Sequence, residues 1–271
     1  MKEQYKFIGI DEGKQTLLFG DTYKNKIHWI KSLENYPTAR ALQNLNNGTF
    51  LMGNDKGYCE VAFENGDILH DCSRWKGITS ALRQQDGTTL LAGTNLEGME
   101  GVSVITLDKN DAIIKAVSCD RDYVRLMSIT DSGTYLLATN DHFRETDQEL
   151  VTIKKLKAEG FYHAWQAQRL KDGRTLVSGG YGRFMAFFDN NGNLSKTFGR
   201  QQDVPEDVTV NFYASFRITD DGKILVANWQ GHGPDNGNKS PQLLCFSFEG
   251  EYLKSWSFPN EISSLQGLLL V

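Results

Sequence analysis

The chain has 271 residues, a formal net charge of −5 and 39% hydrophobic residues. This composition is typical of a globular fold, and the negative charge offers no long-range attraction for a phosphate backbone, so we expect no nucleic-acid partner. No apolar stretch exceeds the short segment from Leu265 to Val271, which is too short to cross a bilayer, so we also expect no membrane insertion.

Three strand-like segments precede residue 36, at residues 5–11, 15–21 and 27–33. Beyond them, one pattern recurs: an acidic, amide or serine residue, then a glycine, then a hydrophobic run. Its glycines lie 39, 46, 40 and 49 residues apart and are Gly48, Gly87, Gly133, Gly173 and Gly222. Because such a period in a chain of short strands indicates one repeated supersecondary unit, the sequence predicts a β-propeller.

Each internal repeat is expected to form four strands. In the second repeat these cover residues 79–84, 88–94, 102–107 and 112–118. The turns Asp86-Gly87 and Lys109-Asn110 join them, because Asn or Asp next to Gly suits tight hairpins.

The two ends of the chain complete the ring. After Trp256 only one strand-like segment remains, from Ile262 to Val271. Together with the three N-terminal strands it makes a blade and covers two strand edges that would otherwise be exposed. We therefore expect a single all-β domain over residues 1–271, a six-bladed propeller of four-stranded antiparallel blades, closed when the C-terminal strand joins the N-terminal blade.

This blade pattern resembles the six-bladed β-propeller superfamily that includes NHL-type, gluconolactonase-like and quinoprotein-like proteins. The resemblance covers essentially the whole chain and rests on the repeat, not on a catalytic motif. It implies a ligand site near the central channel, on the face where the innermost strands begin.

Aromatic and cationic residues recur in the loops expected on that face. Such side chains are favoured at desolvated recognition sites, and they suit a sugar or a sugar acid. The loops that enter the blades supply the candidates Arg40, Trp75, Tyr123, Arg125, Trp165 and Tyr213, and also Arg121. The loops between second and third strands supply Tyr181, Arg183, Asn228, Trp229 and Gln230.

Three of the latter loops are expected to be long, at residues 95–101, 140–148 and 229–241. The third loop overlaps a polar, glycine-rich segment at residues 228–238. We expect Trp229 and His232 in this segment to be exposed loop residues. His163 and His232 are the candidates for acid or base catalysis, because histidine titrates near neutral pH and both should lie on this face.

Metal and cofactor sites find little support in the sequence. The four cysteines, Cys59, Cys72, Cys119 and Cys245, stand singly, so we expect thiols and neither disulfides nor a zinc site. An alternative is a calcium ion in the central channel, because the gluconolactonase-like propellers that the chain resembles hold a divalent ion there. Its oxygen ligands would come from Asp11, Glu12, Asn54, Asn95, Asn140 and Asn228.

Two functions remain open. The first is a propeller, expected to be monomeric, that binds a polar, saccharide-like small molecule or a protein segment. The second is an enzyme, a lyase, lactonase-type hydrolase or epimerase, that acts on a sugar or sugar acid through His163 or His232. The N-terminal residues lack a signal-peptide pattern, so we expect a cytoplasmic protein as the sequence is written, or an exported or periplasmic one if a signal peptide was trimmed.

Overall fold

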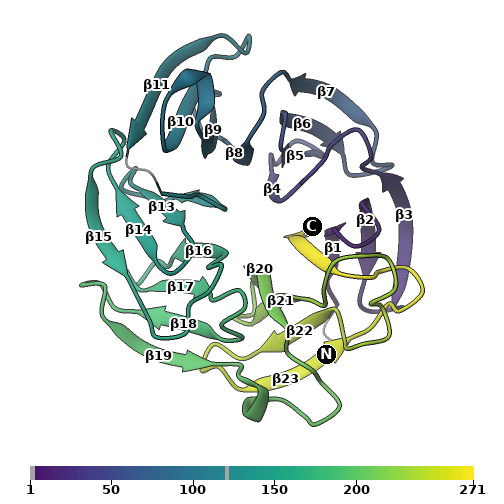
Figure 1. The fold of residues 1–271 in the computed structure, drawn as a ribbon. Coiled ribbons are helices and arrows are strands. Elements are labelled where there is room, and N and C mark those ends of the chain that lie inside the picture. The colour runs from purple at the N-terminus through teal and green to yellow at the C-terminus, as the bar shows by residue number, and fades with distance from the viewer. Residues whose placement is uncertain (1–3, 120–121) are drawn as a thin grey trace.

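The computed structural model describes residues 4–119 and 122–271, and these form a ring of six blades around a central channel (Figure 1). Each blade is a four-stranded antiparallel sheet. Helices in the described residues are limited to two short 3-10 turns, η1 (Leu96–Gly98) and η2 (Gln201–Asp203). None of these helices is long and apolar enough to span a bilayer. The predicted six-bladed, all-β fold is confirmed.

Blade 1 contains both ends of the chain. Its strands, from the channel outward, are β24 (Leu265–Leu270), β1 (Lys6–Asp11), β2 (Thr16–Asp21) and β3 (Lys26–Ser32). Phe7 of β1 lies opposite Gly20 on one side and Leu270 on the other. The C-terminal strand therefore pairs along the inner edge of β1, and the predicted closure of the ring is confirmed.

The other five blades follow the chain in order, each from its inner to its outer strand. Blade 2 contains β4 (Ala41–Asn44), β5 (Thr49–Asn54), β6 (Gly57–Ala62) and β7 (Ile68–Ser73). Blade 3 contains β8 (Ile78–Arg83), β9 (Thr89–Thr94), β10 (Val102–Leu107) and β11 (Ile113–Cys119). Its boundaries differ from the predicted ones by no more than one residue.

The remaining blades repeat this order. Blade 4 contains β12 (Met127–Ile129), β13 (Tyr135–Ala138), β14 (Phe143–Thr146) and β15 (Thr152–Leu156). Blade 5 contains β16 (Gln166–Arg169), β17 (Thr175–Ser178), β18 (Met185–Phe188) and β19 (Leu194–Phe198). Blade 6 contains β20 (Phe212–Ile218), β21 (Ile224–Trp229), β22 (Leu243–Phe246) and β23 (Tyr252–Trp256).

Burial follows the position of a strand within its blade. The middle strand β9 is buried along almost its whole length, because neighbouring blades pack on both of its faces. The outer strand β11 alternates between exposed and partly buried residues, because only one of its faces is covered. Hydrophobic clusters thus fill the spaces between blades, and the turns and loops at the two ends of the strands remain available for function.

One predicted loop is wrong. Residues 140–148 do not form a long loop, because β14 occupies Phe143–Thr146. The sequence conceals this strand because Arg144 and Glu145 are polar, yet both are buried. Glu145 accepts a hydrogen bond from Arg169 at 2.6 Å, and Arg144 donates to Thr152 at 2.8 Å. Paired charges can be buried where single ones cannot, so the hydrophobic pattern is missing although the strand is present.

Candidate functional site

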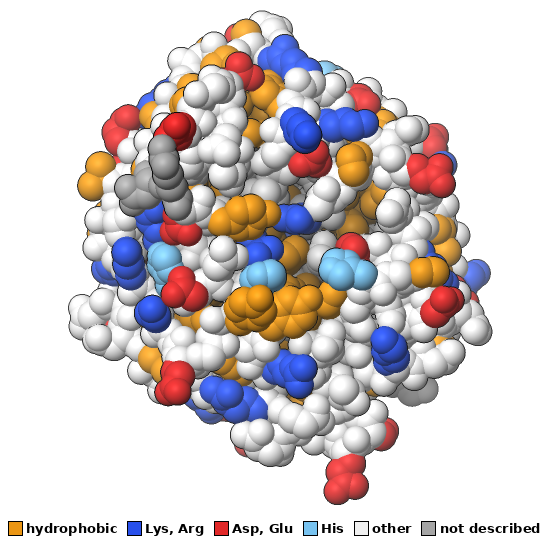
Figure 2. Space-filling model, viewed as in Figure 1, with side chains coloured by type: hydrophobic (Ala, Val, Ile, Leu, Met, Phe, Trp, Pro, Cys, Tyr) orange, Lys and Arg blue, Asp and Glu red, His pale blue; other side chains and the backbone are white. Residues whose placement is uncertain are grey.

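The inner strands begin on the face of the ring shown in Figure 2, where hydrophobic, cationic and histidine side chains surround a central hollow. A cavity of about 150 Å³ lies between the inner strands, and Arg40, directly before β4, lines it. We call the residues around this opening the mouth, and they are Arg40, Tyr123, Arg125, His163 and Tyr181.

Two arginines of the mouth converge on Tyr123. Arg40 donates from Nη1 to the Tyr123 hydroxyl at 3.3 Å, and the Arg125 guanidinium lies 4.9 Å from the centroid of the Tyr123 ring. The Arg40 guanidinium also lies 5.6 Å from the centroid of Trp165. The Nε atoms of Arg40 and Arg125 are both buried and have no hydrogen-bond partner. The protein therefore does not use the full hydrogen-bonding capacity of the two guanidinium groups, and each guanidinium keeps donors that an acceptor at the mouth could bind.

In the part of the chain that the structure describes, no acidic side chain neutralises the positive charge of this pair. Arg125 donates from Nη2 to the amide oxygen of Asn140 at 2.8 Å, and among the residues that the structure describes no carboxylate forms an ion pair with Arg125 or Arg40. Burial, and to a smaller degree the charge of Arg40, lowers the pKa of the Arg125 guanidinium from its ordinary value. An anion between the two arginines would oppose both effects.

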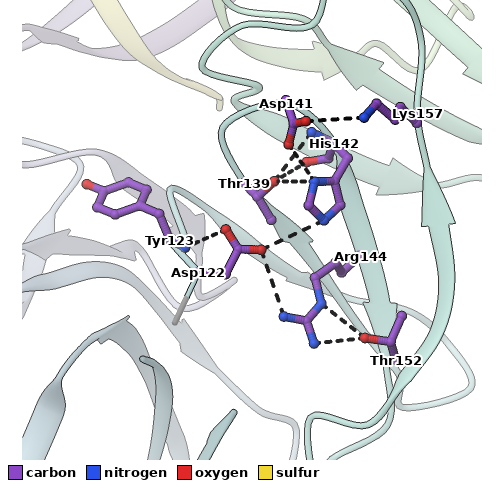
Figure 3. A network of polar contacts seen from close by, with 8 residues as sticks. All are labelled: Asp122, Tyr123, Thr139, Asp141, His142, Arg144, Thr152 and Lys157. Carbon is purple, nitrogen blue, oxygen red and sulfur yellow. Dashed lines mark hydrogen bonds and ion pairs between the residues drawn. The ribbon is translucent and has the colours of Figure 1, made fainter. Parts of the chain in front are cut away.

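A polar network in blade 4 positions Tyr123 (Figure 3). Asp122 accepts a hydrogen bond from the Tyr123 backbone N–H at 2.7 Å. Its other carboxylate oxygen lies 3.9 Å from Arg144 Nη1 and 3.8 Å from His142 Nε2. Arg144 is in turn held by Thr152. The network fixes the backbone at Tyr123. The Tyr123 ring that Arg40 and Arg125 contact therefore has a defined position.

Aromatic rings connect the mouth to blade 6. Tyr181 lies 5.4 Å from His163 and 6.0 Å from Trp229, and Trp229 lies 4.8 Å from His232, as centroid distances. Phe212 packs edge-on against Tyr181 at 4.7 Å and supports this row from below. The structure thus brings together residues from blades 4, 5 and 6 on one face of the ring.

Glu12, at the end of β1, joins this row from blade 1. Its carboxylate accepts a hydrogen bond from the Trp229 indole at 2.9 Å, and its other oxygen lies 2.8 Å from His232 Nδ1. From the sequence, Glu12 is expected only as a possible calcium ligand, because no local pattern connects it to Trp229 and His232, which are 217 and 220 positions away. This face therefore has the two arginines of the mouth on one side and, across the aromatic row, the Glu12–His232 pair.

Trp229 is not the exposed loop residue that the sequence predicts. It is 4% exposed, because β21 continues to Trp229 and its ring packs in the core between blades 6 and 1. His232 is exposed, as expected, with 77% of its side chain accessible. A Trp229 substitution would therefore reduce stability as well as any ligand binding.

The glycine-rich loop that follows β21 is held rigidly. Asn236 Nδ2 lies 2.8, 3.0 and 2.9 Å from the backbone carbonyls of Gly231, His232 and Gly233. The Ser263 hydroxyl donates to the Gly233 carbonyl at 2.6 Å. The loop is thereby attached to the segment that leads into β24, and His232 is held at a defined place.

The two histidines do not converge. Tyr181 and Trp229 lie between their rings, and His163 contacts Tyr162 at a centroid distance of 4.4 Å. Burial, and then the nearby charge of Arg125, lowers the pKa of His163 from its ordinary value. His163 is consequently a neutral imidazole at pH 7, able to accept a proton at the edge of the mouth.

Several candidates lie outside the mouth. Tyr213 is fully buried and donates to the Gly199 carbonyl at 2.6 Å, and Asn228 and Gln230 are buried and donate to the Thr209 carbonyl. Trp75 donates to Glu97 at 2.7 Å, a contact between the loops of blades 2 and 3. These side chains use their polar groups within the protein. Arg183 is exposed, Trp165 is 3% exposed behind Arg40, and Arg121 lies outside the described residues.

The channel below the mouth is lined by cations. Arg217 of β20 also lines the 150 Å³ cavity, and it donates from Nη2 to the carbonyl of Leu42 in blade 2 at 2.8 Å, across the inner edge of blade 1. Burial lowers the pKa of Arg217 to about 10. The residues that line this cavity include Arg40 and Arg217 but no carboxylate. This lining disfavours the calcium ion that the sequence pattern allows there.

Comparisons with known proteins identify the fold. The chain is similar to a protein of unknown function from Bacteroides caccae over 99% of both chains, with 17% identity and a TM-score of 0.81. It is similar to a functionally unknown protein from Desulfotomaculum acetoxidans over 98% of both chains, with 11% identity and a TM-score of 0.62. The WD40 β-propeller domain of Doa1 matches 82% of this chain and 69% of its own, with 11% identity and a TM-score of 0.55.

No protein-family model matches the chain, and neither does any curated protein sequence. At such low identities, the similarity to solved structures establishes the β-propeller fold alone. What the chain shares with NHL-type, gluconolactonase-like or quinoprotein-like proteins is the six-bladed architecture.

Proposed function

We propose that this protein binds a small anionic ligand with a polar ring, such as a sugar acid, at the mouth. The observation that carries the proposal is the pair of arginines, Arg40 and Arg125, which converge on Tyr123 and form no ion pair with a carboxylate among residues 4–119 and 122–271. A carboxylate accepts hydrogen bonds from guanidinium groups more strongly than a neutral acceptor does. The ligand acid group is accordingly assigned to the space between Arg40 and Arg125.

The rest of the ligand would contact the aromatic side chains beside the arginines. Tyr181 and Tyr123 are partly exposed, and Tyr162 is 59% exposed next to His163. Rings of this kind stack on the apolar face of a sugar, and their hydroxyl groups can bind its oxygens. The buried rings of Trp229, Trp165 and Phe212 support this surface and do not themselves offer a contact area.

The test is thermal denaturation with a panel of sugar acids, uronates and aldonates, each paired with its neutral sugar. A ligand present at 100 times its dissociation constant should stabilise the fold by about 2.7 kcal/mol. Arg125→Gln should weaken the binding of an acid on the order of 10- to 100-fold, because a hydrogen bond to a charged group contributes about 1.5–3 kcal/mol.

Arg174→Gln is the matched control. Arg174 follows the Asp172-Gly173 turn at the opposite end of blade 5 and pairs with Asp172 at 2.7 Å, so its loss should leave ligand binding unchanged. Equal stabilisation of wild type and Arg125→Gln by every acid would refute the proposal, and so would stabilisation by the neutral sugars alone.

His163 supports a second candidate, an enzyme that acts on the same class of ligand as a lyase, lactonase-type hydrolase or epimerase. Its neutral imidazole lies near Arg125, where it could remove a proton from a bound acid. His232, paired with Glu12, could act from the other side of the aromatic row. Conversion of a bound acid, followed by NMR and lost in His163→Asn while binding persists, would favour the enzyme over the binding protein.

A further inference from the structure

A second cluster of polar side chains lies at the outer edge of the ring and shares no residue with the mouth. His70 and Cys72 stand at alternate positions of β7, the outer strand of blade 2, so both point to the same side of the strand. Asp111 belongs to the turn between β10 and β11 of blade 3. The ligand atoms of these three side chains all lie within 4.8 Å of one another.

Asp111 is held in place by groups that do not belong to the cluster. The Tyr58 hydroxyl donates to its Oδ1 at 2.5 Å, and Arg74 donates to its backbone carbonyl. Its backbone adopts a left-handed conformation, with φ of 63°. On the open side, its Oδ2 lies 2.8 Å from His70 Nε2. The Asp111 carboxylate therefore has one oxygen fixed by the Tyr58 hydroxyl, and its other oxygen faces His70 and Cys72.

We propose that His70, Cys72 and Asp111 bind a zinc ion that links the outer edges of blades 2 and 3. Imidazole, thiolate and carboxylate are the three ligand types that Zn²⁺ takes in proteins, at about 2.0–2.3 Å. Ligand atoms within 4.8 Å of one another need move little to surround one ion. Because His70 is exposed, solvent can supply water as the fourth ligand.

Zinc binding at this site releases one proton and leaves the metal charge neutralised by its ligands. The Cys72 S–H bond breaks, its proton goes to solvent, and a Zn–S bond forms, with no change of oxidation state. Asp111 and the Cys72 thiolate supply two negative charges for one Zn²⁺, and neutral His70 supplies a lone pair. Without metal, burial raises the pKa of Cys72 to about 12, so it stays a thiol at neutral pH.

The chain contains a matched site that lacks the cysteine. His28 lies on β3, the outer strand of blade 1, and its Nε2 is 3.3 Å from Asp21 Oδ2. A histidine on an outer strand that contacts an aspartate is thus not special to the proposed site. The difference is Cys72, a soft ligand that selects zinc over the hard cations that a lone carboxylate would bind.

The test is titration of the full chain with Co²⁺ and Zn²⁺. Cobalt should bind in about a 1:1 ratio and produce thiolate-to-metal charge-transfer absorption with tetrahedral d–d bands, which zinc should abolish by displacement. Cys72→Ser should remove the charge-transfer band. His70→Asn, at an exposed position, should weaken metal binding at least about 10-fold.

His28→Asn is the control and should bind both metals as wild type does. A melting temperature that rises with zinc in wild type and in His28→Asn, but not in Cys72→Ser, would locate the effect at the site. Absence of the cobalt spectrum in wild type would overturn the proposal, and so would an undiminished spectrum in Cys72→Ser. Neither result bears on the sugar-acid proposal, because the mouth shares no residue with this cluster.

Discussion

At the scale of single residues, the mouth shows how neighbours set the charge of a side chain. His163 lies partly buried beside Tyr162 and Tyr181, and the positive charge of the Arg125 guanidinium repels a proton on its imidazole. Both burial and a nearby positive charge disfavour the imidazolium ion, so its pKa is lowered in the folded protein. The same arginine that would bind an acid thus keeps the adjacent histidine neutral.

A titration by NMR should detect this coupling. His163 should titrate below its ordinary pKa of about 6.5 in the wild type. Arg125→Gln should raise the pKa of His163, because the positive charge that opposes protonation is removed. Arg174→Gln, at the opposite end of blade 5, should leave it unchanged. A His163 pKa that is the same with and without Arg125 would contradict the electrostatic account.

The lowered pKa of His163 also determines how its contribution to the free energy of unfolding changes with pH. Between the folded pKa of His163 and the ordinary value, the unfolded chain binds more protons than the folded one, so His163 lowers the free energy of unfolding as pH falls through this window. Above the ordinary value, the imidazole is neutral in both states and the contribution disappears. His163→Asn should therefore lose less stability than wild type between pH 7.5 and pH 5.5.

At the scale of the element, each blade depends on hairpins whose turns need glycine. Gly87 and Gly173 have φ of 88° and 87°, a region that side chains rarely adopt. At the first turn, Asp86 Oδ1 also accepts a hydrogen bond from the Thr88 N–H at 2.9 Å. Turn chemistry and strand pairing agree, which explains why the repeat is visible in the sequence.

Gly87→Val and Gly173→Val should each destabilise the fold by roughly 1 to 3 kcal/mol. A Cβ at Gly173 would also lie 2.3 Å from the Asn190 side chain, so this variant should be the more destabilised of the two. Lys171→Val is the control, since Lys171 is exposed in the same turn and has no positive φ. Chemical denaturation gives the three values, and equal losses at all three positions would exclude a backbone origin.

At the scale of the whole molecule, the ring is closed by contacts between the two ends of the chain. Asp11 accepts hydrogen bonds from the backbone N–H groups of Ser263 and Ser264 at 2.7 and 2.8 Å. Leu265 and Leu268 of β24 are fully buried between blades. Closure hides the inner edge of β1, which would otherwise be open to pairing with other chains.

Deletion of residues 262–271 should leave an insoluble protein or one that does not unfold cooperatively, because it removes the inner strand of blade 1 and uncovers β1. Deletion of Val271 alone, which is 51% exposed beyond β24, should have a small effect. Solubility and the sharpness of the thermal transition measure the difference. If the 262–271 deletion melts like the intact chain, closure does not stabilise the ring.

The candidate site was predictable in part. Tyr123, Arg125 and His163 follow from blade order alone, because loops that enter successive blades share a face. Tyr213 has the same position in its repeat as the others, yet its ring turns into the core and bonds to Gly199. Burial of one side chain depends on the packing of neighbouring blades, and the repeat carries no information about it.

The six-bladed ring, its hairpin turns and its closure can all be predicted from the amino-acid sequence. These features depend on local rules, glycine at positive φ and apolar residues in short strands, and on a count of strands. The contact between Glu12 and His232, the burial of Trp229 and the convergence of His70, Cys72 and Asp111 become visible only in the folded ring. A closed ring brings together residues from different blades, and the distances between their side chains depend on how every blade between them packs.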